Sequence, residues 1–543
     1  MNIVERISQN WKSGLTVALV SIPLSVSLAV ASQTSPTVGI ITAIWAGITV
    51  SILGGSNYNI VGPTGALSGI LATYAIIHGA SSLPMLAVVA GVMILVAYFF
   101  KLERFLIFVP ASTIHGFTLG VAFIIALNQL NYILGISVIT KHEKFIENVM
   151  ESIRHIPDGS VAAVVIFLVF LAGLFAFLKF LPKVPGAIVL APVGILFGYL
   201  GTIGLLPSYL LVQTLGSKYP EIQGKLFEMP KFFFDNSLLA AAGTVAFVAI
   251  LETMISAKIA DGMTKTKHDK RKEMFGLGAA NIVSGLMGGI PATAALARTS
   301  LNIKSGATDK MSATISSIAI GLISVVFLTY FSYIPLAVVA AILVFTAVRM
   351  VEMKHFVYFA KHHKHELVIA LVVAFITIYE DPIYGILVGM AISLLLHMDK
   401  LSKGHFDVVF NKVDEGIIAK VSGTTLSTDL PSKTDTLVYS VKGTLTYINA
   451  QSHLARFEDS LSGYKHVVLR LRELSFIDVD GIEVLDEIVS VIQSHRKLVV
   501  MSSISDLVKE NLQNESEEYR KLLEKGLIFE STSEALRYLG HNP

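Results

Sequence analysis

The stretch that decides the fold is Val61-Gly62-Pro63-Thr64-Gly65-Ala66-Leu67, and a similar stretch recurs as Gly289-Ile290-Pro291-Ala292-Thr293-Ala294-Ala295-Leu296. Each is a break containing glycine and proline that leads into a short apolar run, over residues 64–77 and 292–304. At about 1.5 Å per helical residue, neither run crosses the ~30 Å hydrocarbon core of a bilayer. Paired interrupted segments at matching positions of two halves indicate a binding site inside a membrane.

The composition around these breaks is that of an integral membrane protein. Of 543 residues, 15% are charged and 53% are hydrophobic, whereas soluble proteins carry about 25% charged residues. Long apolar runs fill residues 14–398 and exclude a soluble enzyme, a disordered chain or a coiled coil for most of the length. The absence of cysteine excludes thiol catalysis and cysteine-ligated metals. The net charge of +2 offers no global field for nucleic acid.

Apolar windows predict about fourteen membrane-spanning segments in two groups of seven. They lie near residues 14–31, 37–53, 64–77, 83–100, 112–134, 161–178, 186–205, 239–258, 273–288, 292–304, 311–329, 333–349, 366–380 and 382–398. The interrupted segment is the third of each group. Because seven is odd, the two groups have opposite topology, so we expect inverted repeats over about 14–205 and 239–398.

Lysine and arginine predict the orientation in the membrane. They gather in the loops at residues 101–104, 258–272 and 349–364, all of which follow even-numbered segments. Basic loops are typically cytoplasmic, so we expect both termini in the cytoplasm, in a bacterial-type inner or plasma membrane. The loop at 135–160 is the weak point, because it carries Lys141, Lys144 and Arg154 on the predicted outer side.

The composition changes after Met398. Residues 1–400 form the predicted membrane domain, and residues 405–543 have the charge density of a soluble protein. We predict a small cytoplasmic α/β domain from strands near 406–410, 417–421, 437–441 and 466–471, and helices near 450–460, 481–494, 505–512 and 532–539. Asp480 and Glu483, at the start of one of these helices, have the spacing of a capping box.

Glu252 is the most telling single residue, because it lies inside the otherwise apolar segment 241–256. A carboxylate at that depth costs roughly 2.5–3.5 kcal/mol or more, so it is expected to be protonated, paired or hydrated. Ser256 follows one helical turn later on the same face. The pair suits either a proton or Na⁺ held by oxygen ligands. The alternative is a carboxylate that only caps or pairs structurally.

The two breaks predict an anion site made of backbone. A half-helix that starts in mid-membrane turns free N–H groups and its positive end toward the cavity. Thr64, Gly65 and Ala66 are predicted to begin one half-helix. The predicted start of the other consists of Ala294, Ala295 and Leu296. The alternative is that these small residues only allow close helix packing.

Arg298 lies one turn into the second half-helix. It could add a full positive charge for the anion or pair with Glu252. The alternative is an arginine that extends toward the membrane interface.

These residues resemble the SulP (sulfate permease) family of anion transporters. The resemblance covers nearly the whole chain and is most specific in Ala260-Asp261-Gly262-Met263-Thr264, Gly278-Ala279-Ala280-Asn281-Ile282-Val283-Ser284-Gly285-Leu286-Met287-Gly288-Gly289-Ile290-Pro291-Ala292-Thr293 and Ala297-Arg298-Thr299. The C-terminal part is similar to a STAS domain, through Gly443-Thr444-Leu445-Thr446-Tyr447-Ile448-Asn449-Ala450 and Phe476-Ile477-Asp478.

The resemblance implies fourteen helices in two inverted seven-helix repeats, with core and gate domains, and usually a homodimer. It implies an anion held between the third and tenth helices. By position, Glu252 matches an acid tied to cation coupling, Arg298 a basic position of the tenth helix, and Thr64 the start of the third. Many sulfate-type members have a glutamine after the first-helix proline. Here Leu24 follows Pro23, which weakens the case for sulfate and raises that for bicarbonate.

The predicted function is secondary active transport of a small inorganic anion, of the sulfate or bicarbonate class, with H⁺ or Na⁺ coupled through Glu252 and Ser256. A dicarboxylate transporter and an uncoupled exchanger or channel are the alternatives. No cofactor and no metal site are predicted, apart from Na⁺ at Glu252 and Ser256. No phosphate-binding loop or catalytic triad indicates an enzyme. The partner of the STAS domain stays open.

Overall fold

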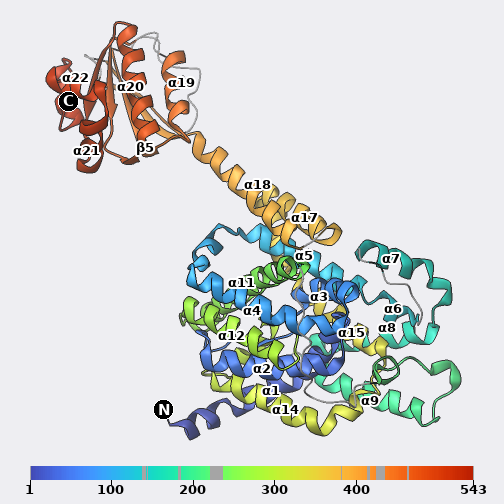
Figure 1. Ribbon diagram of the computed structural model, residues 1–543. Coiled ribbons are helices and arrows are strands. Elements are labelled where there is room, and N and C mark those ends of the chain that lie inside the picture. Colours follow the sequence, from blue (N-terminus) through green and yellow to red (C-terminus); the bar gives the residue numbers. More distant parts are fainter. Residues whose placement is uncertain are drawn as a thin grey trace. The chain divides into compact units, whose positions relative to one another are not determined.

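The computed structural model describes residues 2–136, 142, 145–181, 185–220, 236–380, 382–412, 416–423, 435–460 and 464–541. The chain forms two compact units, Met1–Ala391 and Ile392–Pro543, which divide within the last long helix (Figure 1). Lys141 and Lys144, the weak point of the predicted orientation, lie outside the described residues.

The first half of the membrane unit contains a helix in each predicted apolar segment. The helices are α1 (Ile3–Ala31), α2 (Pro36–Leu53), α3 (Gly65–His78), α4 (Leu83–Phe99), α5 (Ala111–Leu127), α6 (Leu130–Leu134), α8 (Val161–Phe180) and α9 (Gly186–Thr202), with α7 (Phe145–Arg154) and α10 (Leu215–Lys218) in the connections. The predicted segment 112–134 is two helices, α5 and α6, which are divided at Asn128 and Gln129.

The second half also contains a helix in each predicted apolar segment. Its helices are α11 (Asn236–Thr264), α12 (Lys270–Leu286), α13 (Leu296–Lys304), α14 (Met311–Phe331), α15 (Leu336–Met350), α16 (Met353–His362), α17 (Lys364–Tyr379) and α18 (Pro382–Ser402). Within the described ranges, nine helical stretches are long and apolar enough to cross a membrane by length and composition. The arrangement in two inverted repeats stays a prediction.

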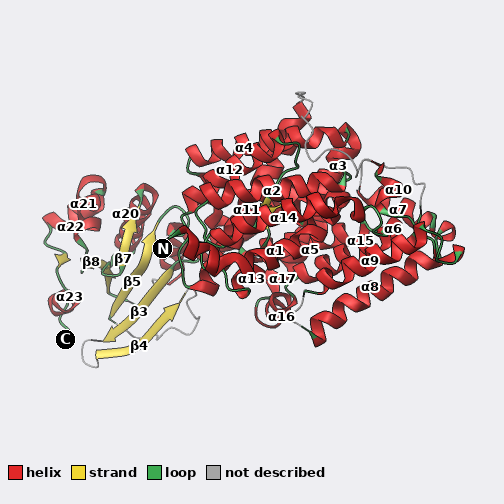
Figure 2. Ribbon diagram, turned by 90° about the horizontal axis from the view of Figure 1, so that it is seen from below, coloured by secondary structure: helices red, strands yellow, loops and turns green. Residues whose placement is uncertain are grey.

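A two-stranded ladder joins the two breaks inside the helical unit. Strand β1 (Val61–Gly62) pairs antiparallel with β2 (Thr293–Ala294), with Val61 opposite Ala294 and Gly62 opposite Thr293. Helix α1, whose interior contains Pro23, packs against both half-helices α3 and α13. Strands otherwise belong to the second unit (Figure 2).

The second unit is an α/β domain around one sheet. Its strands are β3 (His405–Lys412), β4 (Gly416–Gly423), β5 (Thr436–Leu445), β6 (His466–Arg470), β7 (Leu474–Ile477), β8 (Leu498–Ser502) and β9 (Ile528–Phe529), in the order β4-β3-β5-β6-β8-β9, and β7 pairs with β5. Its helices are α19 (Ala450–Ser460), α20 (Val479–Ser494), α21 (Asp506–Glu515), α22 (Glu517–Glu524) and α23 (Thr532–Tyr538).

The start of α20 corrects one local prediction. Asp478, not Asp480, is the N-cap residue, and its carboxylate accepts a hydrogen bond from the Gly481 N–H at 2.8 Å. Asp478 also accepts from the Tyr447 N–H at 3.2 Å and so joins two loops of the domain. The capping-box spacing of Asp480 and Glu483 therefore falls inside the helix.

Candidate functional site

The ladder brings the N-termini of the two half-helices to one place. The chain passes from β1 through Pro63 and Thr64 into α3, and from β2 through Ala295 into α13. The Ala295 N–H extends the ladder by donating to the Ile60 carbonyl at 3.0 Å. Helix N-termini carry unpaired N–H groups and a partial positive charge. Two such ends beside one short ladder are suited to hold an anion.

At the first break, Thr64 is the N-cap residue of α3, but its hydroxyl does not cap the helix. Thr64 Oγ1 instead donates to Glu252 Oε2 on α11, at 3.2 Å. Gly65 starts the helix in a confined space, where an added Cβ would lie 2.5 Å from Ile125 Cδ1 on α5. The side chain of Thr64 thus leaves the backbone donors of α3 uncapped and joins the start of the helix to Glu252.

At the second break the helix begins one residue later than the equivalent predicted position. Ala295 is the N-cap residue and Leu296 is the first residue of α13. The Ala294 N–H donates to Thr253 Oγ1 at 3.1 Å, and the Ala295 N–H is used by the ladder. Of the predicted donors Ala294, Ala295 and Leu296, only Leu296 belongs to the helix end, which continues with Ala297 and Arg298.

The two prolines explain this offset. Pro63 follows β1, whereas Pro291 precedes β2. Aligning the breaks on their prolines therefore shifts the second one relative to the ladder. Exposure at the second break also increases toward the later helix start. Ala294 is buried, Ala295 and Leu296 are half-buried, and Ala297 is exposed.

Arg298 links the two breaks. Its side chain is 2% exposed, so it does not extend to the membrane interface. Nη2 donates to the Pro63 carbonyl at 2.5 Å. Nη1 is buried without a hydrogen-bond partner among the described residues and lies where a Cβ on Gly62 would be 2.9 Å away. A buried donor without a protein partner indicates a place for a ligand or water.

Glu252 and Arg298 stand at the same breaks without pairing. No ion pair joins them in the described part of the chain: the carboxylate accepts from Thr64, and the guanidinium donates to Pro63. Glu252 as a whole residue is half-buried. The site therefore contains a carboxyl group and a guanidinium that are not paired with each other.

Ser256 faces a different group from the one predicted. Its hydroxyl, which is fully buried, contacts Asn59 Oδ1 and Thr299 Oγ1, each at 3.0 Å. No hydrogen bond joins Ser256 to Glu252 in the described residues. Ser256 therefore belongs to a network beneath the ladder, and its role in cation binding stays a prediction.

That network contains a buried acid that sequence reasoning missed. Glu273 of α12 is fully buried. It accepts from Asn59 Nδ2 at 2.6 Å and from the N–H groups of Gly55 and Ser56, both at 2.7 Å. An acid at the first position of a predicted apolar segment is easily attributed to the membrane surface. The asparagine shortly before the first break was the available signal.

Asn281, also missed, fixes the second break from α12. Its Nδ2 donates to the Ala292 carbonyl at 2.9 Å, and its Oδ1 accepts from the Ala292 N–H at 2.8 Å. One amide thus satisfies both backbone groups of a residue that lies outside any helix. An amide inside an apolar helix that directly precedes a break was the signal for this contact.

Comparison with known proteins agrees with this geometry. Residues 8–373 match the sulfate permease family, and residues 427–535 match the STAS domain. The putative sulfate transporter YvdB of Bacillus subtilis is 31% identical over 518 residues, which cover 94% of each chain. The bicarbonate transporter BicA of Picosynechococcus sp. is 23% identical over 410 residues, which cover 72% of this chain and 70% of that protein.

Solved structures share the fold. The murine solute carrier 26 family member A9 anion transporter aligns with a TM-score of 0.82 over 99% of this chain and 92% of that chain, at 16% identity. The transmembrane domain of a cyanobacterial bicarbonate transporter BicA aligns with a TM-score of 0.61 over 72% of this chain and 98% of that chain, at 19% identity. The predicted fold class, a polytopic helical membrane transporter with an α/β STAS domain, is confirmed. The chain belongs to the sulfate permease family of anion transporters, carries a C-terminal STAS domain, and is a transporter rather than an enzyme.

Proposed function

We propose that the protein moves a small inorganic oxyanion of the sulfate or bicarbonate class together with a cation, H⁺ or Na⁺, and that Glu252 couples the two. The hydrogen bond from Thr64 Oγ1 to Glu252 Oε2, at 3.2 Å, carries this proposal. One residue thereby serves as N-cap of the half-helix that faces the anion and as partner of the acid. A change in the charge of Glu252 acts directly on the anion site.

The proposed anion ligands are the N–H groups at the start of α3, with Thr64, Gly65 and Ala66, and those at the start of α13, from Leu296 to Arg298. Arg298 adds a full charge, and its Nη1 has no described partner. An oxyanion with several acceptor oxygens suits donors that converge from two helices. Relatives named for sulfate and for bicarbonate both support this substrate class.

Electrostatics supply the proposed coupling. An ionised Glu252 beside the anion site repels an anion, because like charges a few ångströms apart interact unfavourably in a low-dielectric interior. Neutralising the carboxylate with a proton or Na⁺ removes that repulsion. Cation and anion therefore bind together and cross together, which is symport.

Uptake into proteoliposomes tests the coupling. The experiment compares wild type, Glu252→Gln and the control Glu366→Gln, an acid in the first turn of α17, under separate pH and Na⁺ gradients with labelled sulfate or bicarbonate. Wild type and the control should concentrate the anion under one gradient, which identifies the cation. Glu252→Gln should exchange anion for anion but lose accumulation under both gradients. A Glu252→Gln protein that still concentrates the anion refutes the coupling role.

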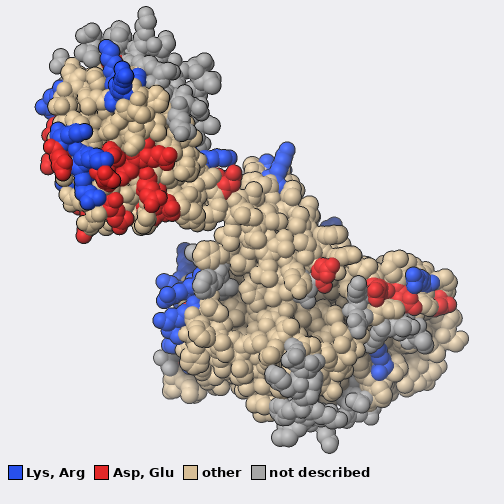
Figure 3. All heavy atoms as spheres, turned by 45° about the horizontal axis from the view of Figure 1, so that its top comes forward, with Lys and Arg blue, Asp and Glu red and all other residues tan. Residues whose placement is uncertain are grey.

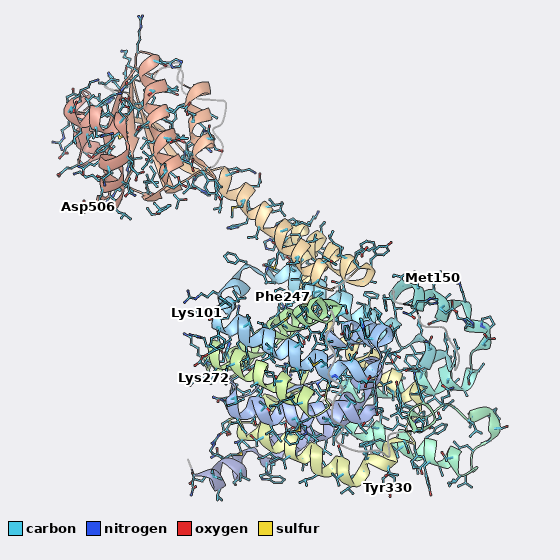
Figure 4. All side chains as sticks on the ribbon, in the orientation of Figure 1. Lys101, Met150, Phe247, Lys272, Tyr330 and Asp506 are labelled. Carbon is cyan, nitrogen blue, oxygen red and sulfur yellow. The ribbon has the colours of Figure 1, made fainter. Side chains whose placement is uncertain are left out.

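We further propose a homodimer with both termini in the cytoplasm, on the side of the basic loops. Lys101 and Lys272, at the ends of α4 and α12, lie at the same edge of the membrane unit (Figure 4), and a cluster of basic residues is visible in Figure 3. Membrane-impermeant labelling of single cysteines at these positions in oriented vesicles tests the orientation. Labelling from the outer face would contradict it.

A further inference from the structure

A polar cavity lies toward the end of α3 opposite the break. Its volume is about 380 Å³, and α3 contributes Ala72 and Ile76 to its wall. The polar part of the wall consists mainly of amides and hydroxyls, among them Asn128, Asn131, Gln213 and Ser217. Lys218 is the one charged residue in its described lining, which holds no carboxylate. Neutral donors around a single cation are the chemistry of an anion site.

The charge of Lys218 is fixed in position by Tyr132. The ammonium donates to the Tyr132 hydroxyl and lies 4.2 Å from the centroid of that ring. Tyr132 itself is 7% exposed, so it is held in the protein. A cation held in this way keeps its position beside the cavity instead of moving freely in solvent.

Among the described residues, an acid beside the cavity wall has basic neighbours of its own. Helix α7 contributes Asn148, Val149 and Ser152 to the lining. Glu151 on the same helix lies 3.6 Å from Arg154 Nη1 and 3.7 Å from His155 Nδ1. Its side chain is 14% exposed. Glu151 is thus paired with basic groups at the C-terminal end of α7.

The cavity and the candidate site lie along the same helices. Ala72 is two turns beyond Gly65, about 10 Å along α3 at 1.5 Å per residue. Ile125 on α5 lies next to Gly65. Leu127, the last residue of α5, and Asn128, its C-cap residue, line the cavity. Leu67 and Leu71, both almost fully buried, lie on α3 between the break and the cavity. Figure 4 shows Met150, on α7, at the edge of the membrane unit opposite Lys101 and Lys272.

We propose that this cavity is an outer vestibule that binds the inorganic oxyanion before it reaches the break. The proposal rests on the proposed function only for the identity of the anion and the outer side. It assigns anion binding to Lys218 and the surrounding amides, independently of Arg298 and Glu252.

Single-cysteine labelling tests the vestibule directly, because the chain contains no cysteine of its own. Ser217→Cys, with Asn128→Cys as a second probe if the first fails to fold, is treated with membrane-impermeant thiol reagents of either charge. The anionic reagent should react faster by about fivefold, the effect of one unit charge about 4 Å away across water. Sulfate or bicarbonate should slow that reaction. Ser208→Cys, exposed in the same connection but outside the cavity, should show neither effect.

Two further variants separate the vestibule from the break. Lys218→Gln should abolish the preference for the anionic reagent and the protection by anion. It should also raise the KM for uptake by about fivefold at low ionic strength, with a much smaller change in kcat. Arg298→Ala should leave protection at Ser217→Cys intact even though the KM for uptake rises. Equal reaction rates with both reagents, absence of protection, or loss of protection in Arg298→Ala would each overturn the proposal. Protection by chloride but not by sulfate or bicarbonate would overturn the oxyanion assignment.

Discussion

The two breaks pair in one ladder but are held in different ways. At the first, α3 begins with its backbone donors unused, and its N-cap hydroxyl is given to Glu252. At the second, Thr253 and Ile60 take the N–H groups of Ala294 and Ala295, and Arg298 supplies a charge that reaches back to the first break. Similar sequence here means a similar backbone path, not a similar role. Both breaks lead into a helix N-terminus, but the first is linked to the acid, whereas the second is held more tightly by hydrogen bonds and adds a charge.

Removing the charge of the second break should have the largest effect. Arg298→Ala deletes a charged hydrogen bond, worth about 1.5–3 kcal/mol, so we expect KM to rise roughly 10- to 100-fold. Arg298→Lys should recover part of the affinity by restoring charge without the guanidinium geometry. Expression should stay near wild type. An unchanged KM in the alanine variant would remove Arg298 from the anion site.

Displacing the same charge without deleting it should cost less. In Gly62→Ala the new Cβ would lie 2.9 Å from Arg298 Nη1. The guanidinium must shift, at a cost of about 1–3 kcal/mol for overpacking, and uptake should fall several-fold. Gly243→Ala on α11 is the matched control, because its Cβ would meet only Met93 Sδ, at 3.8 Å. If both variants behave alike, contact with Gly62 does not position Arg298.

Loosening the second break should affect stability more than transport. Thr253→Val removes the acceptor of the Ala294 N–H and the hydroxyl pair with Thr293. We expect a loss of about 1–3 kcal/mol, because the buried Ala294 N–H is left without its acceptor, seen as a lower midpoint of thermal unfolding in detergent. KM should change by no more than about twofold, because this N–H is not among the proposed anion ligands. A large rise in KM with normal unfolding would place Ala294 among the ligands after all.

The smallest expected effect separates the two functions of Thr64. Thr64→Ser keeps the hydroxyl that donates to Glu252 and should transport like wild type. Thr64→Val keeps the shape and loses the donor. We expect it to bind the anion but to couple less tightly, measured as a lower accumulation ratio under the driving gradient. Equal coupling in both variants would show that this hydrogen bond does not link acid and anion.

Most of the fold could be predicted from the sequence, because membrane helices are long apolar runs. All the predicted apolar segments contain helices, and the two short ones are short for the reason expected: each starts at a break. In the second unit, the alternating strands β3 to β6 were predicted, whereas β7 and β9, of four and two residues, offered little pattern.

The sequence singles out Glu252 and Arg298, which the structure places at the two breaks, but it does not predict their hydrogen-bond partners. Glu252 and Arg298 stand out because charges are rare in apolar segments. The ladder could not be foreseen, because two-residue strands give no periodic signal and pair across the halves of the chain. The later start of α13 could not be predicted from the sequence either. It depends on whether the proline precedes or follows the strand, and the strands themselves give no signal. Ser256 was placed correctly on its helix, but its partner Asn59 comes from another segment.

The ladder also sets a condition on biogenesis. Among the described residues, the strand partners of Val61 and Gly62 are Thr293 and Ala294, which the ribosome makes long after the first seven segments. Until then the peptide groups of the first break have no strand partner at membrane depth, where an unsatisfied backbone group costs several kcal/mol. We therefore expect the first break to stay in contact with water or protein until β2 has been made. Chains that terminate before β2 should therefore be recognised as unfinished and degraded, although all their apolar segments can insert.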